Sequence, residues 1–410
     1  MRTQTLLYSL LATGTLGHVI RNPNPSASPK VIGKAVYILT NDKTNAIVAL
    51  PINAKGTLSK GSVTPSGGSG SDSIHADTQM PAAPDALISQ SALTLAGDNI
   101  FAVNAGSNTI SMFELSPYDP THLRQVGKPA ALPGDFPNTV AASAKHSLVC
   151  AAMTGARNGI SCASFSASNG IGTMDHLRST GLNQTTPPMG PTNTVSHILI
   201  NADESAFVTM VKGNPGTTQN GYISTLPIQS KKSCGGDGAT SSVPAKDLRS
   251  TPNGTEVLFG TQNIPGGNNV FTTDASFGAV VLSLDPTTGA ATTLGKGVIA
   301  NQSATCWSAI SSVTGSAFVT DVNIPRLVEM STKDASIIKI TDLSSGGDPG
   351  FIDLKAAGDF LYVLSPGNGT STPAILVLDI SGGQGTAKQI QRFSLEGIAG
   401  KLAQGMAILE

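Results

Sequence analysis

The chain has 410 residues, of which only 12% are charged, and its formal net charge is -1. This length exceeds that of one ordinary compact domain, unless the domain is built from repeats. The few Lys and Arg residues are scattered, so the sequence lacks the basic stripe that a nucleic-acid backbone requires, and we expect no nucleic-acid partner. The 45 glycines and the scarcity of helix-forming runs are typical of an all-β chain with many turns.

The first 30 residues are predicted to precede the folded domain. Met1-Arg2 gives a positive start, and the apolar stretch LLYSLLATGTLG ends in small residues, which is the pattern of a secretory signal peptide over residues 1–17. Residues 18–30 include NPNPSASP and are predicted to form a linker. A buried first strand is the alternative for the apolar stretch. No later segment is long and apolar enough for a membrane helix, so we expect a secreted protein without a membrane span.

The remainder, residues 31–410, repeats one β-hairpin pattern. Each copy has an apolar run, a turn rich in Gly, Asn, Asp or Pro, and a second run that alternates apolar and polar residues. Most copies have a further strand upstream and a weaker one downstream. The copies begin, at spacings within the range of propeller blades, at Ala35, Asn99, Leu148, Ala206, Val270, Ala317 and Phe360. Seven units of four strands predict a single seven-bladed β-propeller, which we expect to be monomeric.

The copy at Ala35 has no upstream strand, because NPNPSASPK precedes it. The chain ends in GMAILE, which reads as an unpartnered inner strand. We therefore predict that Met406 to Leu409 complete the first blade and close the ring. The alternative is a disordered tail.

Four cysteines and four glycosylation sequons accompany the predicted secretion. Cys150 and Cys162 flank a predicted hairpin at positions that face each other, so we expect them to form a disulfide. Cys234 and Cys306 would pair by default, with one or both thiols remaining free as the alternative. The N-x-[ST] sequons lie at Asn183, Asn253, Asn301 and Asn368.

The segments FAVNAGSNTISMF and PAAPDALISQSALTLAGDNIF resemble the lactonase-type seven-bladed propellers, and in particular the secreted fungal proteins named carboxymuconate cyclase-like. Similar segments cover nearly the whole chain after about Lys30. The resemblance implies a propeller with a site near its axis. Relatives either close a carboxymuconate into a lactone or hydrolyse a sugar-phosphate lactone.

The active members of that family carry His-Pro-His-like, Gly-Pro-Arg-His and Asn-Glu elements at three places, and this sequence departs from all three. Phe136-Pro137-Asn138 stands at the first place, Thr192 and Asn193 at the second, and Val211-Lys212 at the third. Holding and protonating a tricarboxylate requires cations and an acid. We therefore expect the family's catalysis to be lost.

The residues that enter the predicted inner strands are mostly carboxylates and amides. Such groups would suit a Ca²⁺ ion at the axis or the hydroxyls of a carbohydrate or other neutral small molecule. Alternatively, they cap strands and satisfy turn amides. These candidate ligand-binding residues are Asp85, Asp135, Asn138, Thr192, Asn193, Asp348 and Asp353.

Three other side chains are candidates for a site. Trp307 would stack on a ring ligand at the axis, or else fill the hub. His75 would serve as a general base above the axis, or else be a solvated loop histidine. Lys212 is the most plausible cation of a substitute catalytic site, together with His75.

The sequence is compatible with three functions. The first is a secreted, glycosylated binding protein or antigen that contacts a small molecule, a carbohydrate, or a host or cell-wall surface, and that has lost the family's catalysis. The second is a 3-carboxymuconate cyclase or lactone hydrolase with a relocated site. The third is a structural surface glycoprotein without a small ligand. An acidic axis would favour the binding protein. An acid, a base and a cation that converge at the axis would favour the enzyme. An axis plugged by side chains would favour the structural glycoprotein.

Overall fold

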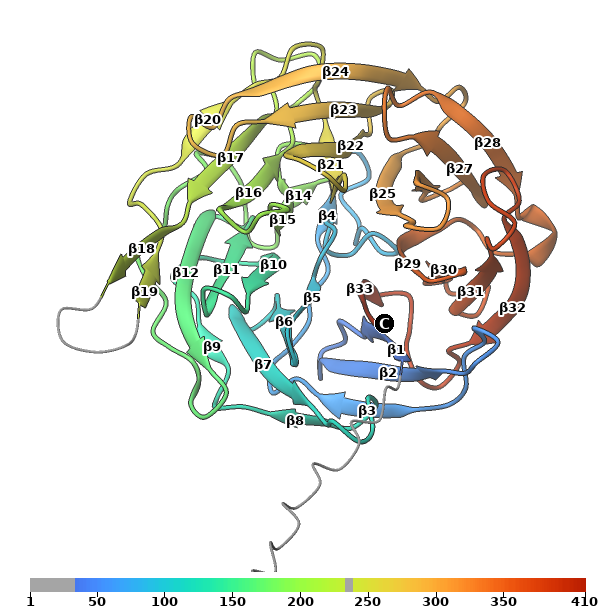
Figure 1. The fold of residues 1–410 in the computed structure, drawn as a ribbon, viewed down its shortest axis with the longest axis horizontal. Helices are drawn as coiled ribbons and strands as arrows, with labels where there is room; N and C mark the ends of the chain where they lie inside the picture. Colours follow the sequence, from blue (N-terminus) through green and yellow to red (C-terminus); the bar gives the residue numbers. More distant parts are fainter. Residues whose placement is uncertain (1–33, 233–238) are drawn as a thin grey trace, which may run out of the picture.

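The computed structural model describes residues 34–232 and 239–410, which form a ring of seven sheets around a central axis (Figure 1). The predicted seven-bladed propeller is confirmed. The predicted signal peptide and linker lie outside the described residues, as does Cys234. None of the described segments forms a helix that is long and apolar enough to cross a membrane.

Each blade is an antiparallel sheet whose innermost strand faces the axis. The first blade orders its strands as β33 (Gln404–Leu409), β1 (Lys34–Leu39), β2 (Ala46–Ile52) and β3 (Ser62–Pro65). From the axis outward, the second has β5 (Leu93–Ala96), β6 (Asn99–Asn104), β7 (Thr109–Leu115) and β8 (Leu123–Gln125), with β9 (Ala130–Ala131) also paired to β7, and the third has β10 (Pro137–Ser143), β11 (Leu148–Met153), β12 (Gly159–Ser166) and β13 (Gly170–Ile171).

The remaining blades follow the same plan. The fourth has β15 (Val195–Ile200), β16 (Ala206–Val211), β17 (Tyr222–Pro227) and β20 (Leu248–Ser250), and the fifth has β21 (Leu258–Asn263), β22 (Asn269–Asp274), β23 (Gly278–Leu284) and β24 (Ala291–Val298). The sixth has β25 (Thr305–Ile310), β26 (Ser316–Asp321), β27 (Arg326–Ser331) and β28 (Ile337–Asp342), and the seventh has β29 (Ile352–Ala357), β30 (Phe360–Ser365), β31 (Ala374–Asp379) and β32 (Lys388–Ser394).

Five short elements lie outside the blades. A hairpin of β18 (Gln229–Lys232) and β19 (Ala239–Ser242) projects from the rim, and a short 3₁₀ turn spans Ser344–Gly346 (Figure 1). Near the axis, β4 (Ile74–His75) pairs in parallel with β14 (Met189–Gly190), so two distant segments meet over the ring.

The C-terminal strand closes the ring as predicted. Strand β33 pairs antiparallel with β1, so that Val36 faces Ile408 and Tyr37 faces Ala407. The first blade therefore contains both the first and the last described strands of the chain, and the alternative of a disordered tail is wrong.

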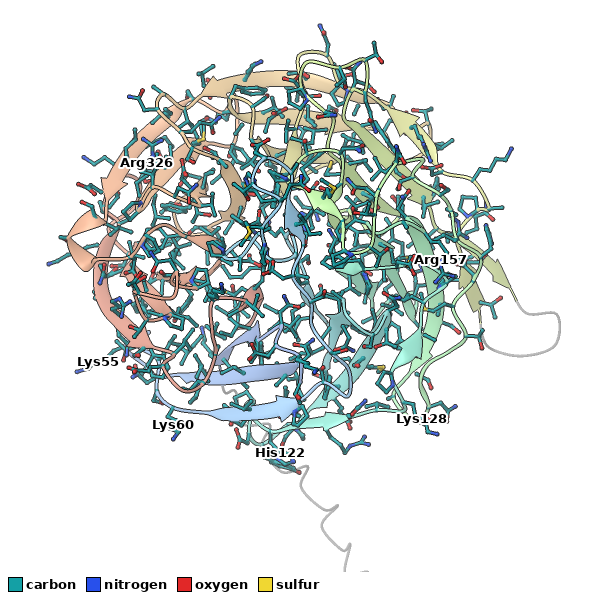
Figure 2. All side chains as sticks on the ribbon, turned by 180° about the vertical axis from the view of Figure 1, so that it is seen from behind. Lys55, Lys60, His122, Lys128, Arg157 and Arg326 are labelled. Carbon is teal, nitrogen blue, oxygen red and sulfur yellow. A yellow bond between two sulfur atoms is a disulfide. The ribbon has the colours of Figure 1, made fainter. Side chains whose placement is uncertain are left out.

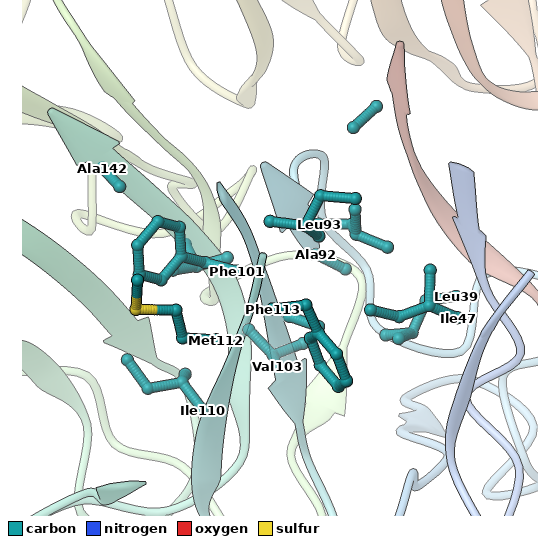
Figure 3. Close-up of a cluster of buried hydrophobic side chains, with 14 of the residues drawn as sticks. Leu39, Ile47, Ala92, Leu93, Phe101, Val103, Ile110, Met112, Phe113 and Ala142 are labelled. Atoms are coloured by element: carbon teal, nitrogen blue, oxygen red, sulfur yellow. The ribbon is translucent and has the colours of Figure 1, made fainter. Parts of the chain in front are cut away.

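Apolar side chains fill the spaces between neighbouring blades. Figure 3 shows Leu39 and Ile47 of the first blade against Val103 and Phe113 of the second, and all four are fully buried. Alternate residues of a strand point to opposite faces of its sheet. The two neighbouring blades can therefore cover both faces of each blade. Lysine side chains such as Lys55, Lys60 and Lys128 lie at the periphery of the ring (Figure 2).

The loop from β4 to β5 crosses the hub in a segment that we call the axial segment, residues Asp85–Ser91. Its backbone and side chains are hydrogen-bonded to the inner strands of the first, third, fourth, sixth and seventh blades. Ile88 and Ser91 have positive φ angles of 50° and 67°, which few residue types adopt without support. The many contacts to the surrounding strands supply that support, and the segment plugs the hub.

The predicted disulfide between Cys150 and Cys162 is confirmed, and it joins directly opposite residues of β11 and β12. The second predicted disulfide is wrong, because Cys306 is a buried free thiol. Cys306 is the second residue of the inner strand β25, and its side chain is buried near the axis.

Candidate functional site

A cavity of about 470 Å³ lies at the end of the ring where the inner strands begin. The loop from β4 to the axial segment forms one wall, and the fourth, fifth and sixth blades form the others. Much of the lining is apolar and comes from Pro, Ala and Val residues and from Phe259. The polar groups that matter most for its chemistry are those of His75, Asp85, Thr192, Lys212 and Cys306.

Lys212 is a buried cation in the cavity wall. It directly follows β16, its side chain is only 1% exposed, and its Nζ donates a hydrogen bond of 2.8 Å to the carbonyl oxygen of Ile88. The ammonium also lies 4.5 Å from the centre of the Phe259 ring. Burial disfavours the charged form and lowers the pKa of Lys212 to about 8, although the negative charge of Asp85 opposes this effect.

Asp85 begins the axial segment and lies on the same cavity. Gln404 donates a hydrogen bond of 3.0 Å to its carboxylate. Burial raises the pKa of Asp85 to about 6, and the positive charge of Lys212 and the bond from Gln404 partly offset that rise. No ion-pair contact joins Asp85 to Lys212 within the described ranges, where the ion pairs involve other residues. Among the described residues, the ammonium is therefore without a carboxylate in direct contact.

His75 is held above the cavity by the pairing of β4 with β14. Its backbone N–H donates to the carbonyl of Met80, and its Nδ1 atom is buried without a hydrogen-bond partner among the described residues. The structure thus brings together His75, Asp85, Thr192 and Lys212, all of which the sequence identified as candidates. An acid, a base and a cation converge on one cavity beside a plugged hub.

Three predicted ligand residues instead hold the axial segment in place. Asn138 donates through Nδ2 to the carbonyls of Leu87 and Val195, at 3.2 and 2.7 Å. Trp307 is fully buried and packs edge-on against Phe259, with ring centres 5.1 Å apart. The buried position of Trp307 agrees with the alternative interpretation, in which this side chain fills the hub.

Asp353 is the third of these residues. It is fully buried, has a φ angle of 41°, and accepts a hydrogen bond of 3.1 Å from Gln90. Burial raises the pKa of its carboxyl to about 6, while Lys355 and the bond from Gln90 act in the opposite direction. Gln90 is itself part of the axial segment, so Asp353 helps to anchor that segment to the seventh blade.

The remaining candidates lie away from the cavity. Asp135 is paired with Arg157 at 2.7 Å and Asp348 with Arg392 at 2.9 Å, while Asn193 is hydrogen-bonded to Gln219 and to the backbone of Asn183. Across residues 34–232 and 239–410, no three His, Cys, Asp or Glu side chains lie close enough to hold a metal ion. The carboxylates considered for Ca²⁺ therefore do not converge.

Two features of the site were not identified from the sequence. Phe259 and Cys306 line the cavity, and burial raises the pKa of the Cys306 thiol well above its usual range. Gln404 anchors both Asp85 and the backbone of Leu87, the latter by a bond of 2.7 Å. Gln404 lies at the start of an inner strand, as Asn138 and Asp353 do. That shared position in the sequence pattern could have identified it as a residue near the axis.

Comparisons with known proteins support the fold. No family model and no curated protein matches the chain. Among solved structures, a Lactobacillus plantarum protein aligns with a TM-score of 0.61 and 14% identity over 92% of this chain and 99% of its own. A Bacteroides fragilis protein named for 6-phosphogluconolactonase activity aligns with a TM-score of 0.56 and 13% identity over 94% and 100% of the two chains. At these identities the likeness establishes a common propeller fold.

Proposed function

We propose that this protein is a secreted, glycosylated propeller of the carboxymuconate cyclase-like or lactonase-like type that binds a small organic carboxylate in the cavity, with Lys212 as the counter-ion. The observation that carries the proposal is a buried ammonium that no carboxylate of residues 34–232 or 239–410 contacts directly. Burying an unpaired charge is costly, so such a group is retained where it meets an anion from outside or reacts.

The shape and lining of the cavity narrow the class of ligand. A volume of about 470 Å³ is within the range for small-molecule sites. Apolar walls around one buried cation favour a largely apolar molecule with one carboxylate. A sugar would need more hydrogen-bonding groups, and a polyanion would need more cations than Lys212 supplies.

Trp307 provides an intrinsic probe for this proposal, because it is the only Trp in the chain and packs on Phe259 of the cavity wall. Its fluorescence should respond saturably to monocarboxylates such as benzoate and phenylacetate, and much more weakly to the corresponding amides. We expect Lys212→Met to weaken carboxylate binding at least tenfold.

Lys296→Met is the matched control, since Lys296 also lies over a phenylalanine ring, that of Phe277, but on the exposed outer strand. Equal binding of acids and amides, or undiminished carboxylate binding by Lys212→Met, would contradict the proposal. Circular dichroism of both variants shows whether the fold is kept.

A second candidate is lactone hydrolysis, which the convergence of His75 and Asp85 beside Lys212 favours. In this reaction, water would attack the lactone carbonyl while His75 accepts its proton, and Lys212 would stabilise the oxyanion. The ring C–O bond then breaks, and protonated Asp85 would donate a proton to the leaving oxygen. Hydrolysis of an aryl-substituted lactone that is lost in both His75→Ala and Lys212→Met would support this activity over binding alone.

A further inference from the structure

The alternation of strand directions places every connection at one of two ends of the ring. The inner strand of each blade begins at the cavity end, as Phe259 and Cys306 show by lining the cavity near the starts of β21 and β25. Connections from an outermost strand to the next inner strand, and from the second strand of a blade to the third, therefore lie at the cavity end. The other two kinds of turn lie at the opposite end.

All four sequons fall in connections at the cavity end. Asn183, Asn253 and Asn301 lie between an outermost strand and the inner strand of the next blade, following β13, β20 and β24 respectively. Asn368 lies between β30 and β31, the second and third strands of the seventh blade. None of the sequons is at the opposite end, although that end also has exposed turns, such as the one that contains Asn169.

The four asparagines are also chemically available. Each is exposed, and within the described part of the chain none of their Nδ2 groups donates a hydrogen bond, whereas the buried Asn138 and Asn158 use theirs to hold the backbone. At Asn368, the hydroxyl of Thr370, the third residue of the sequon, donates a hydrogen bond of 2.9 Å to Oδ1. The Nδ2 nitrogen, which accepts the sugar, has no hydrogen-bond partner among the described residues.

Two of the sequons are next to the cavity itself. The backbone carbonyl of Asn183 accepts a hydrogen bond of 3.2 Å from Asn193, whose neighbour Thr192 lines the cavity. Asn301 is two residues before Ser303, which also lines the cavity. Oligosaccharides on these two asparagines would extend from beside the fourth-blade and the sixth-blade parts of the cavity lining.

We propose that this protein carries N-linked oligosaccharides at Asn183, Asn253, Asn301 and Asn368, so that sugar surrounds the cavity mouth and the opposite end of the ring stays bare. The proposal rests on the secretory route in the proposed function. The donor is a polyprenyl-diphosphate-linked oligosaccharide. A bond forms between Nδ2 and the sugar C1 atom, the bond from C1 to the diphosphate oxygen breaks, and the amide proton is lost as the diphosphate leaves.

This arrangement gives the two ends of the propeller different roles. Flexible, hydrated sugar around the mouth would leave a path for a small carboxylate while keeping macromolecules away from the cavity. Contacts with a large partner would then use the bare end or the rim.

The test is site mapping on the full chain secreted from a eukaryotic host. Enzymatic release of N-glycans in H₂¹⁸O converts each modified asparagine to ¹⁸O-labelled aspartate, which peptide mass spectrometry locates. We expect label at all four sequon asparagines and none at Asn169. The variant Ile171→Thr introduces a sequon at Asn169, and its modification would show that the transferase reaches the opposite end, so that the one-sided pattern comes from the sequence.

Absence of label at Asn183 or Asn301 in secreted protein would overturn the proposal, because sugar would then not flank the mouth. Retention of the unmodified chain inside the cell would overturn it together with the secretory part of the proposed function. Carboxylate binding is measured separately on unglycosylated protein, so failure of that function would be recognised independently.

Discussion

The indole Nε1 of Trp307 donates a hydrogen bond of 3.0 Å to the carbonyl oxygen of Ser89, which is 218 positions earlier in the chain. The same carbonyl accepts a bond of 3.1 Å from the side chain of Gln404. One backbone oxygen of the axial segment thus joins the sixth blade to the first through the hub.

Replacing Trp307 with phenylalanine should destabilise the whole ring. The change removes a buried donor and leaves a void beside Phe259, and we expect a loss of roughly 2–4 kcal/mol in the free energy of unfolding. Urea unfolding followed by circular dichroism measures this loss of stability. Tyr118→Phe is the control, because Tyr118 is 59% exposed and should change stability little. A loss no larger than that of the control would mean that the axial segment does not brace the hub.

Asp353→Asn should change how stability depends on pH. The carboxyl has its ordinary pKa of 3.8 in the unfolded chain and a pKa of about 6 in the folded protein. The unfolded chain therefore loses its proton first, and this group lowers stability as pH rises from about 4 to 6, by at most on the order of 3 kcal/mol. Wild-type Tm should decline over this interval relative to the Asp353→Asn variant. Parallel curves for the wild-type protein and the Asp353→Asn variant would contradict the assignment.

Carboxylate binding should depend on pH through Lys212 and Asp85. Loss of the proton from Lys212, with its pKa of about 8, removes the counter-ion, so affinity should fall roughly tenfold per pH unit above that value. Protonation of Asp85 below about pH 6 removes a competing negative charge, so affinity should rise there. Benzoate titrations from pH 5 to 9.5, followed by Trp307 fluorescence, test both limbs. In Asp85→Asn the low-pH rise should disappear, while the fall at high pH should remain and begin at a lower pH, because the charge of Asp85 no longer raises the pKa of Lys212. A flat profile in wild-type protein would exclude the lysine as counter-ion.

The disulfide should stabilise the third blade. It closes a sequence separation of 12 residues, for which chain entropy predicts about 2–3 kcal/mol. The double variant Cys150→Ala, Cys162→Ala should lose that amount in urea unfolding and become insensitive to reductant. Cys306→Ala keeps the disulfide, so its stability should still decrease on reduction. If reduction leaves wild-type stability unchanged, the bridge contributes nothing to the fold.

The protein should not cyclise 3-carboxymuconate at a useful rate. Three carboxylates require several cations, and the cavity wall contributes one buried lysine. Ultraviolet absorbance of the substrate with purified protein should stay constant beyond the uncatalysed rate. Turnover near 1 per second, which is ordinary for an enzyme, would contradict this expectation if Lys212→Met or His75→Ala abolished it.

The blades could be predicted from the sequence because their signals are local. Alternating apolar runs around Gly and Asn turns define each hairpin, and the missing strand before Ala35 indicates closure by the last residues. The pairing of Cys150 with Cys162 could also be predicted, because one hairpin turn sets their register.

The hub could not be predicted in the same way, because its contacts join residues far apart in the chain. Nothing near Asn138 or Asp353 in the sequence indicates that each would be hydrogen-bonded to the axial segment. Asp135 and Asp348 are neutralised by arginines 22 and 44 positions away, which only the fold brings near. Pairing Cys306 by elimination failed because a count of cysteines carries no information on distance.

Strand β33 covers the inner edge of β1 in the first blade, so a chain that lacks β33 would leave this edge unpaired. Without Gln404–Leu409, strand β1 would expose an unpaired edge of the buried residues Ala35 to Leu39 to water. Such an edge readily accepts a foreign strand. A truncated chain would therefore be prone to self-association, and a synthetic peptide of sequence QGMAIL, supplied in trans, is the molecule best matched to block it.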